Sequence, residues 1–281
     1  MESMIEAIKR RTSVRTYTDQ PIEEAKKQAI IDLVHSNHIG PFGHTVRFEL
    51  IDFSKMERSE IRGLGTYGVI SRANLYIVSA VKDHARAMED LGYCFERVIL
   101  VATNLGLGTC WLGGTFKRAN FAKRIHVSDD EIVPAISPIG YADKRRTTME
   151  RAIRRFAKSD ERKPWEELFF DGDMGTPLSK EDAGKYTTAL ECVRRGPSAS
   201  NNQPWRIVRE EDQGTLHFYL KRTRGYDELF KGVDLQRIDM GIAMCHFQLA
   251  GREIGLDGRW EERDPDLHLG NVEYIATWTE S

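Results

Sequence analysis

The sequence predicts an α+β fold that consists of two fused copies of one unit. Residues 21–51 and 177–208 both predict a helix, a loop that contains Gly and Pro, and a strand, in the same order. When the 281-residue chain is shifted by 149 positions against itself, Asp90-Leu91-Gly92 aligns with Asp239-Met240-Gly241. Two copies of a unit in one chain predict a pseudo-twofold axis, the covalent equivalent of a symmetric homodimer.

The 149-residue register extends beyond these two short segments. It continues without a gap to Trp111 and Trp260, which follow two predicted helices with the same apolar spacing. We expect the first copy to span residues 1–158 and the second copy to span residues 159–281. The two copies are expected to be intertwined as one compact unit.

Composition and charge disfavour several classes of protein. Lys and Arg number 41 together, against 43 for Asp and Glu, so no strong net charge attracts a nucleic acid or an anionic membrane. The four cysteines stand singly, without the spacing of a disulfide framework or a zinc site. No apolar run approaches the roughly 18 residues that cross a bilayer. We therefore expect a soluble, cytoplasmic protein without a metal, and with neither nucleic acid nor membrane as a partner.

A short N-terminal helix around residues 5–8 is expected to end in the segment Arg10–Tyr17, termed the arginine segment. This segment contains three arginines, a serine and two threonines. Arginine offers a charged bidentate fork and the hydroxyl groups add short hydrogen bonds, which together suit a phosphate and a polyhydroxyl chain. A solvated basic turn is the other interpretation of the same residues.

The first copy continues with two predicted helices and two predicted strands. Pro21 begins a helix that reaches about Val34, and strand-like stretches follow at 46–51 and 75–80. Residues 88–105 form the strongest predicted helix, because apolar side chains recur there at spacings of three and four. We expect this helix to be central and mostly buried.

Two later segments of the first copy bear on function. In Thr109–Thr115, termed the glycine loop, Gly113 and Gly114 leave backbone N–H groups uncovered, so that a flat ligand could approach the main chain. An ordinary glycine-rich helix-to-strand connection explains these residues equally well. A strand interrupted by prolines is predicted at 131–141. Basic residues between 144 and 158 then predict a solvated helix, whose first residues could also contact a phosphate.

The segment Gly63–Gly68 matches the pattern G-x-G-x-x-G of dinucleotide-binding folds. That pattern requires a strand before it and a helix after it. Here a charged, helical stretch at 55–62 precedes the glycines and a strand follows them. We therefore expect a turn-rich loop and no Rossmann site.

The second copy contains the segment Gly196–Trp205, termed the Pro-Ser loop, which reads Gly-Pro-Ser-Ala-Ser-Asn-Asn-Gln-Pro-Trp. Two prolines fix the backbone, and the Ser and Asn side chains offer groups that orient a planar polar ligand. A capped turn before a strand is the alternative. The first copy has the plain sequence Gly40-Pro41-Phe42-Gly43 at this place, and the second copy has no arginine segment before Pro177. The two copies together are thus expected to hold one complete site.

The arginine segment, the glycine loop and the Pro-Ser loop, in this order, resemble the nitroreductase family of FMN-dependent oxidoreductases over nearly the whole chain. The resemblance implies a nitroreductase-like fold, in which each copy has a small, mainly antiparallel sheet and long central helices. Family members are usually homodimers that bind FMN between subunits. This chain is similar to the small subgroup of fused nitroreductases, so the resemblance implies one FMN between its two copies.

The resemblance also implies which residues contact FMN. The arginine segment would hold the phosphate and the ribityl chain, helped by two basic residues after the interrupted strand, with Arg15 near the pyrimidine edge of the ring. Main-chain N–H groups of the glycine loop would face the N5 side of the ring. The expected contacts are Arg11, Thr12, Ser13, Arg15, Leu112, Gly113, Gly114, Lys144, Arg145, Pro197, Ser198 and Asn201. No catalytic side chain is expected, because the flavin carries the chemistry.

The implied activity is a ping-pong cycle in which NAD(P)H reduces FMN and a nitroaromatic, quinone or related small-molecule acceptor reoxidises it. The fused chain is expected to be a monomeric pseudo-dimer, although two such chains could associate further. Two alternatives remain open at the level of sequence. The chain could be a flavin-binding or sensing protein without rapid turnover, or a non-catalytic interaction protein that docks through its basic run at 144–163.

Overall fold

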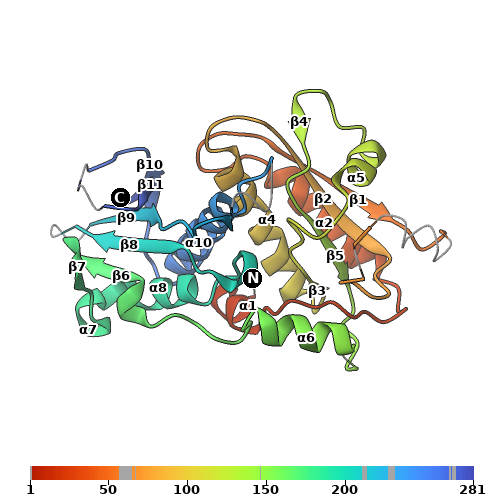
Figure 1. The fold of residues 1–281 in the computed structure, drawn as a ribbon, viewed down its shortest axis with the longest axis horizontal. Helices are drawn as coiled ribbons and strands as arrows, with labels where there is room; N and C mark the ends of the chain where they lie inside the picture. The colour runs from red at the N-terminus through yellow and green to blue at the C-terminus, as the bar shows by residue number, and fades with distance from the viewer. Residues whose placement is uncertain are drawn as a thin grey trace.

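Two separate sheets flank a central pair of helices (Figure 1). This computed structural model describes residues 2–281 except 57–64, 67, 146, 211–213, 227–231, 266, 268 and 269. The predicted helix at 55–62 and the segment Gly63–Gly68 therefore fall largely outside the described residues. Within the described residues, no helix has both the length and the apolarity needed to cross a bilayer.

The central helices are α4 (Ala87–Asn104) and α10 (Leu235–Glu253), which contact each other extensively. Glycines allow their close approach. A Cβ atom on Gly92 would lie 2.1 Å from the carbonyl oxygen of Ile238, and one on Gly241 would lie 2.0 Å from that of Glu89. Both the glycines and their partners are 149 positions apart, so the register of the sequence is a pseudo-twofold relation in space.

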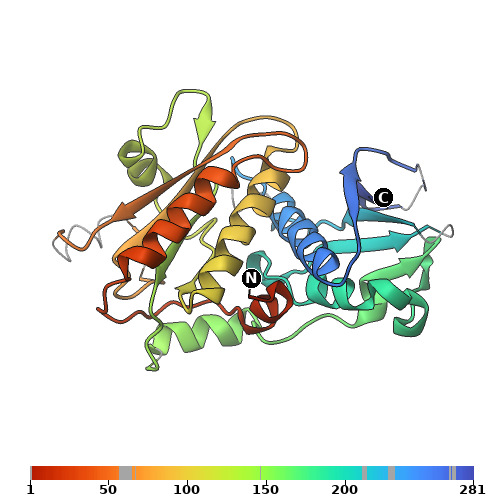
Figure 2. The same cartoon turned by 180° about the vertical axis from the view of Figure 1, so that it is seen from behind.

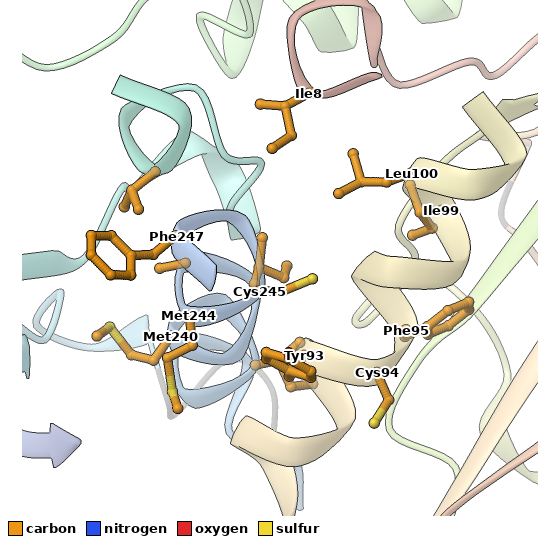
Figure 3. Packing of buried hydrophobic residues seen from close by; sticks show 14 of the residues in the cluster. Ile8, Tyr93, Cys94, Phe95, Ile99, Leu100, Met240, Met244, Cys245 and Phe247 are labelled. Atoms are coloured by element: carbon orange, nitrogen blue, oxygen red, sulfur yellow. The ribbon is translucent and has the colours of Figure 1, made fainter. Parts of the chain in front are cut away.

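Apolar side chains fill the surroundings of this crossing. Figure 3 shows Phe95 and Ile99 on α4, Met244 and Phe247 on α10, and Ile8 of α1 (Met4–Arg10) above both helices. All five side chains are buried. The helix α1, from the start of the first copy, thus packs against the central helices of both copies.

The first sheet is built from residues 46–140 and is antiparallel throughout. In spatial order it contains β1 (Val46–Asp52), β2 (Leu75–Lys82), β5 (Ile136–Gly140) and β3 (Gly108–Thr109), with β4 (Glu131–Ile132) also paired to β2. The single strand predicted over 131–141 is therefore divided at residues 133–135. The helix α2 (Glu24–Ser36) lies beside α4 over this sheet (Figure 2).

The second sheet is built from residues 169–280 and is antiparallel except between β6 and β8. In spatial order it contains β10 (Gly258–Glu261), β11 (Glu273–Glu280), β9 (Thr215–Leu220), β8 (Trp205–Arg209), β6 (Phe169–Asp171) and β7 (Asp173–Pro177). The predicted α+β class, with small, mainly antiparallel sheets around long central helices, is thus confirmed. Because no strand in the described part of the chain crosses between the sheets, we propose residues 1–158 and 159–281 as the two repeats.

Shorter helices connect these layers. They are α5 (Arg118–Arg124), α6 (Thr148–Phe156), α7 (Lys180–Ala183), α8 (Thr187–Arg194) and the 3-10 turns η1 (Trp165–Glu167), η2 (Gly184–Tyr186) and η3 (Ala199–Asn201). The helix predicted between Pro177 and Val193 is broken at Gly184, where φ is 52°. Of the basic run at 144–163, only residues 148–156 form the helix α6, which lies where the chain passes from the first sheet to the second (Figure 1).

Candidate functional site

A cavity of about 520 Å³ lies between the two copies. Its walls come from the arginine segment, the glycine loop and α6 of the first copy, and from the Pro-Ser loop and α10 of the second. This volume is within the range of small-molecule and cofactor sites. The two motifs that the sequence places in different copies, the arginine segment and the Pro-Ser loop, therefore meet at one cavity.

Most of the predicted contact residues line this cavity. Those that do are Arg11, Ser13, Arg15, Leu112, Gly113, Gly114, Pro197, Ser198 and Asn201. Thr12, Lys144 and Arg145 are exposed and are not among the described lining residues. The Thr12 hydroxyl instead accepts a hydrogen bond of 3.1 Å from Nη1 of Arg154 on α6. Direct ligand contact by these three side chains therefore stays a prediction without support from the lining of the cavity.

Two arginines of the arginine segment carry buried donors without an acceptor. Nε of Arg11 and both Nε and Nη1 of Arg15 are buried, and none has a hydrogen-bond partner among the described residues. Burial lowers the pKa of Arg11, an effect that the nearby Glu96 carboxylate opposes. Buried polar groups are nearly always satisfied by protein, water or a ligand, so these donors mark a place where a bound molecule could supply the acceptor.

Glu96 of α4 contacts two residues of the cavity wall, Arg11 and Trp111. Its side chain is fully buried, and Oε1 lies 3.9 Å from Nε of Arg11. Oε2 accepts a hydrogen bond of 2.7 Å from Nε1 of Trp111, which also lines the cavity. His246 of α10 contacts the same carboxylate at 2.8 Å through Nε2. One buried acid thus holds side chains from three segments of the chain.

The glycine loop presents its main chain to the cavity at two residues rather than three. The N–H of Leu112 donates to the carbonyl of Ile136 at 2.9 Å, so the prediction that this N–H faces a ligand is wrong. The N–H groups of Gly113 and Gly114 have no hydrogen-bond partner in the described part of the chain. A Cβ on Gly113 would lie 2.5 Å from Cδ2 of Leu235, so glycine lets this side chain of α10 pack against the loop.

The Pro-Ser loop is held by a buried carboxylate on α10. The N–H of Ala199 donates to Oδ1 and Oδ2 of Asp239, at 2.9 and 3.1 Å. Burial raises the pKa of Asp239 well above its usual range, and the hydrogen bond from Ala199 opposes this rise. Ser200 and Asn201 have φ values of 51° and 58°, in the left-handed region that non-glycine residues seldom occupy. The conformation of this loop is therefore imposed by its tertiary contacts.

Asn201 lines the cavity, but its amide group serves the chain itself. Nδ2 donates to the carbonyl oxygens of Lys158 and Glu161, at 2.8 and 3.0 Å. Oδ1 accepts from Nη1 of Arg162 at 3.4 Å. Asn201 is one of the predicted ligand contacts, whereas in the structure its amide fastens the Pro-Ser loop to the segment that joins the two copies.

Arg162 lines the cavity, although it is not among the residues predicted from the sequence. Its Nη1 donates to the Ser159 and Glu161 carbonyls and its Nη2 to that of Arg195, while its buried Nε has no partner among the described residues. Burial, and next the charge of Arg11, lower the pKa of Arg162 to about 10. Residues 159–163 carry no periodic pattern, so only the fold could place this arginine.

The helix α6 is largely exposed, as predicted for a solvated helix, but one of its faces also lines the cavity. Ala152, Ile153, Phe156 and Ala157 on one face line the cavity. The signal was present in the sequence, because residues 152, 153 and 156 are apolar at helical spacing within the basic run. Leu235, Ile238 and Ile242 of α10 form a further apolar wall.

The pseudo-equivalent position in the other copy is covered by ion pairs. In the 149-residue register, Leu235 and Gly113 correspond to Arg86 and Glu262, whose Nε and Oε2 are 3.3 Å apart. The fully buried Glu89 accepts hydrogen bonds on Oε1 from Arg86 at 3.4 Å and from Arg237 at 2.5 Å. The apolar contact beside the cavity is therefore replaced by charged contacts at this second position.

The whole-chain comparisons agree with this architecture. Residues 3–251 match the family model described as "Putative TM nitroreductase". A "putative nitroreductase" from Thermotoga maritima has a similar fold, with a TM-score of 0.63 and 21% identity over 99% of this chain and 94% of that chain.

Two further solved structures overlap about half of this chain. A nitroreductase family protein from Clostridium novyi NT has a TM-score of 0.43 and 22% identity over 51% of this chain and 87% of its own. An FMN-dependent nitroreductase from Clostridium difficile R20291 has a TM-score of 0.41 and 20% identity over 51% of this chain and 90% of its own. No curated protein matches the chain. Since the family model covers residues 3–251, this chain belongs to the nitroreductase family that the model describes.

Proposed function

We propose that this protein is an FMN-dependent oxidoreductase that uses NAD(P)H to reduce nitroaromatics, quinones or related small acceptors in a ping-pong cycle. One observation carries the proposal. At the junction of the two copies, Arg11, Arg15 and Arg162 share one cavity with the glycine loop, and each has a buried Nε without a hydrogen-bond partner among the described residues. Such a cavity suits a ligand that is anionic at one end and flat elsewhere.

The residues present fit FMN. A phosphate needs several charged donors, which these arginines have in surplus. A flat ring needs apolar walls and main-chain donors at its polar edge. The wall of α10 matches the first need, and the N–H groups of Gly113 and Gly114, which have no partner among the described residues, match the second. Gly113 also keeps its side of the cavity free of a side chain.

Roles follow for the residues of this chain. Arg11 and Arg162 would bind the phosphate, with Arg162 in the role that sequence reasoning assigned to Lys144 and Arg145. Arg15 would lie at the polar edge of the ring, where a fixed cation stabilises negative charge. Ser13, Pro197 and Ser198 would complete the pocket. When bound, FMN would supply the transfer of hydride and electrons between NAD(P)H and the acceptor.

The ion pairs at the pseudo-equivalent position support a single FMN per chain. Because the cavity draws its residues from both copies, the site needs no second chain, and we propose a monomeric pseudo-dimer. Size-exclusion chromatography with light scattering would measure the mass of the protein in solution, which is expected to be that of one chain. A cavity that binds flavin only in a dimer would contradict the proposal.

The direct test measures flavin content and turnover separately. Protein purified and incubated with FMN is expected to retain about one flavin per chain, seen in its absorbance spectrum. NAD(P)H oxidation with menadione or nitrofurazone as the acceptor is then expected to exceed that of free FMN. Flavin binding without turnover would identify a flavin-binding or sensing protein. Failure to bind FMN at all would overturn the proposal.

A further inference from the structure

A buried histidine on α10 lies next to the residues that form one end of the cavity. His246 is fully buried and is not among the described lining residues. Its Nδ1 lies 2.8 Å from the carbonyl oxygen of Cys192, and its Nε2 lies 2.8 Å from Oε1 of Glu96. Carbonyl and carboxylate oxygens only accept hydrogen bonds, so both ring nitrogens carry a hydrogen when Glu96 is ionised. A histidine ring with both hydrogens is a cation.

The other contacts of Glu96 are those of an ionised carboxylate. Its Oε2 accepts a hydrogen bond of 2.7 Å from the indole N–H of Trp111. The guanidinium of Arg11, which also carries a positive charge, approaches Oε1. A fully buried carboxylate is costly unless it is paired and hydrogen-bonded. His246 supplies both the charge and the hydrogen bond.

Two cations thus face the same carboxylate oxygen at unequal distances. Nε2 of His246 is 2.8 Å from Oε1 of Glu96, whereas Nε of Arg11 is 3.9 Å from it. The longer distance exceeds the roughly 3.2 Å of an N–H···O hydrogen bond. Nε of Arg11 is therefore buried without a hydrogen-bond partner among the described residues. His246 occupies the acceptor that Arg11 would otherwise use.

The second copy shows that an indole at this place needs no charged partner. Trp260, which is 149 positions after Trp111, donates through Nε1 to the neutral side chain of Gln248 at 2.9 Å. In the same register Glu96 corresponds to Cys245. The buried carboxylate therefore accompanies the arginine segment rather than the tryptophan.

We propose that His246 is a positioning residue that, as a cation, pairs with Glu96 and so leaves Arg11 available to the anionic group of the ligand. This inference rests on the proposed function for the identity of that ligand, FMN. It adds a residue outside the cavity that determines how tightly the phosphate is bound. Without the charge of His246, Arg11 would pair with the buried carboxylate, and its donor would be lost to the phosphate.

The test compares FMN with riboflavin, which lacks the phosphate. His246→Gln removes the cation from this position. The dissociation constant of FMN is expected to rise about tenfold in this variant, and that of riboflavin to stay within about twofold of its original value. Equal losses for the two flavins would indicate a merely structural role and would overturn the proposal.

A double variant tests the cause of the loss. Adding Glu96→Gln to His246→Gln removes the competing carboxylate, so the dissociation constant of FMN is expected to return to within about threefold of the original. A larger loss than in His246→Gln alone would contradict the proposed competition. If His246→Gln does not fold, Glu96→Gln alone decides. It is expected to bind FMN within about threefold of the original, and a loss of about tenfold or more would overturn the proposal.

His217→Gln is the matched control. His217 on β9 is also fully buried, its Nδ1 lies 2.8 Å from the hydroxyl of Thr277, and it is not among the described lining residues. Its replacement is expected to lower the free energy of unfolding in urea without changing the ratio of the two dissociation constants. A changed ratio would mean that any loss of a buried histidine disturbs the phosphate site, and would remove the support for His246.

Two measurements separate this inference from the proposed function. Nitrogen NMR of the histidine rings, without flavin, is expected to show both ring nitrogens of His246 protonated at neutral pH, and a neutral ring would overturn the inference even if FMN binds. If the protein binds no FMN, the proposed function fails. Calorimetry with inorganic phosphate then tests His246 by itself: weaker binding in His246→Gln would support its role, and unchanged binding or none in the original protein would overturn it.

Discussion

The two copies meet through similar helices, yet one side of their junction is a cavity and the other is a network of ion pairs. On the cavity side, Leu235 of α10 packs against Gly113. At the equivalent positions on the other side, Arg86 pairs with Glu262. The two sides of the junction thus differ in the kind of contact that joins the copies, aliphatic beside the cavity and charged at the equivalent position.

A second pair of positions has kept the same role in both copies. Asp90 on α4 accepts hydrogen bonds from the N–H groups of Phe42 and His44, at 2.8 and 2.9 Å. Asp239, 149 positions later, accepts from Ala199 of the Pro-Ser loop. Each central helix thus uses a buried carboxylate to hold the loop of its own copy. The copies resemble each other where the fold requires it and differ where the ligand would bind.

The largest expected effect concerns the helix crossing that both copies share. Gly92→Ala and Gly241→Ala are each expected to lower the free energy of unfolding by at least about 3 kcal/mol, because the added methyl group would overlap a backbone carbonyl of the other helix. Urea denaturation measures this loss. The control is Gly214→Ala, where a Cβ has no neighbour within 4 Å and little change is expected. A large loss at only one of the two central glycines would contradict the pseudo-twofold relation.

The next largest effect is a loss of stability on the side of the junction that carries the ion pairs. Arg237→Ala is expected to destabilise the protein by about 3 kcal/mol, because it removes a partner from the fully buried carboxylate of Glu89. FMN content should be unchanged in the fraction that folds. Arg259→Ala is the control, since its ion pair with Glu261 is largely exposed and is expected to contribute less than about 1 kcal/mol. Loss of FMN from folded Arg237→Ala would indicate that FMN binds near the ion pairs and not in the proposed cavity.

On the cavity side the expected effect is on binding rather than folding. Arg15→Ala is expected to weaken FMN binding by about tenfold to a hundredfold, because hydrogen bonds from a charged donor would be lost. The dissociation constant follows from the quenching of flavin fluorescence. Arg155→Ala, exposed on α6 and not among the described lining residues, should bind FMN normally. Equal losses in both variants would mean that the cavity is not the flavin site.

The smallest effect concerns the bidentate ion pair of each sheet. Arg47 pairs with Glu131 in the first sheet, and Arg209 pairs with Asp171 in the second. Hydrogen bonds from Arg47 lower the pKa of Glu131 from 4.5 to about 2. Its stabilising contribution is therefore complete above pH 4.5 and is lost as the pH falls toward 2.

Glu131→Gln tests this linkage. The variant is expected to be about 1 kcal/mol less stable at pH 7, after allowance for solvent screening, and to match the original protein near pH 2. Urea denaturation at several pH values measures the difference. Asp171→Asn is the matched change in the second sheet and should cost a similar amount at pH 7. A stability gap for Glu131→Gln that does not narrow on acidification would refute the cause given for the pKa.

Much of the fold could be predicted because its signals are local or repeated. The apolar spacing at 88–105 predicted α4 to within one residue at each end, and the 149-residue register predicted its partner α10. The helix between Pro177 and Val193 was less predictable, since the break at Gly184 depends on a backbone conformation that glycine permits but does not require. The domain boundary at 158 and the single flavin remain proposals.

By itself, the sequence determined that two related α+β units occur in one chain and that their distinctive motifs are divided between them. Periodicity and repetition are carried by residue types alone. Only the tertiary structure decided which groups face the cavity. In the folded chain, the amide of Asn201 and the N–H of Leu112 form hydrogen bonds with backbone carbonyls. Arg162 and one face of α6 line the cavity. These outcomes depend on hydrogen-bond partners that are remote in the sequence, which no local pattern specifies.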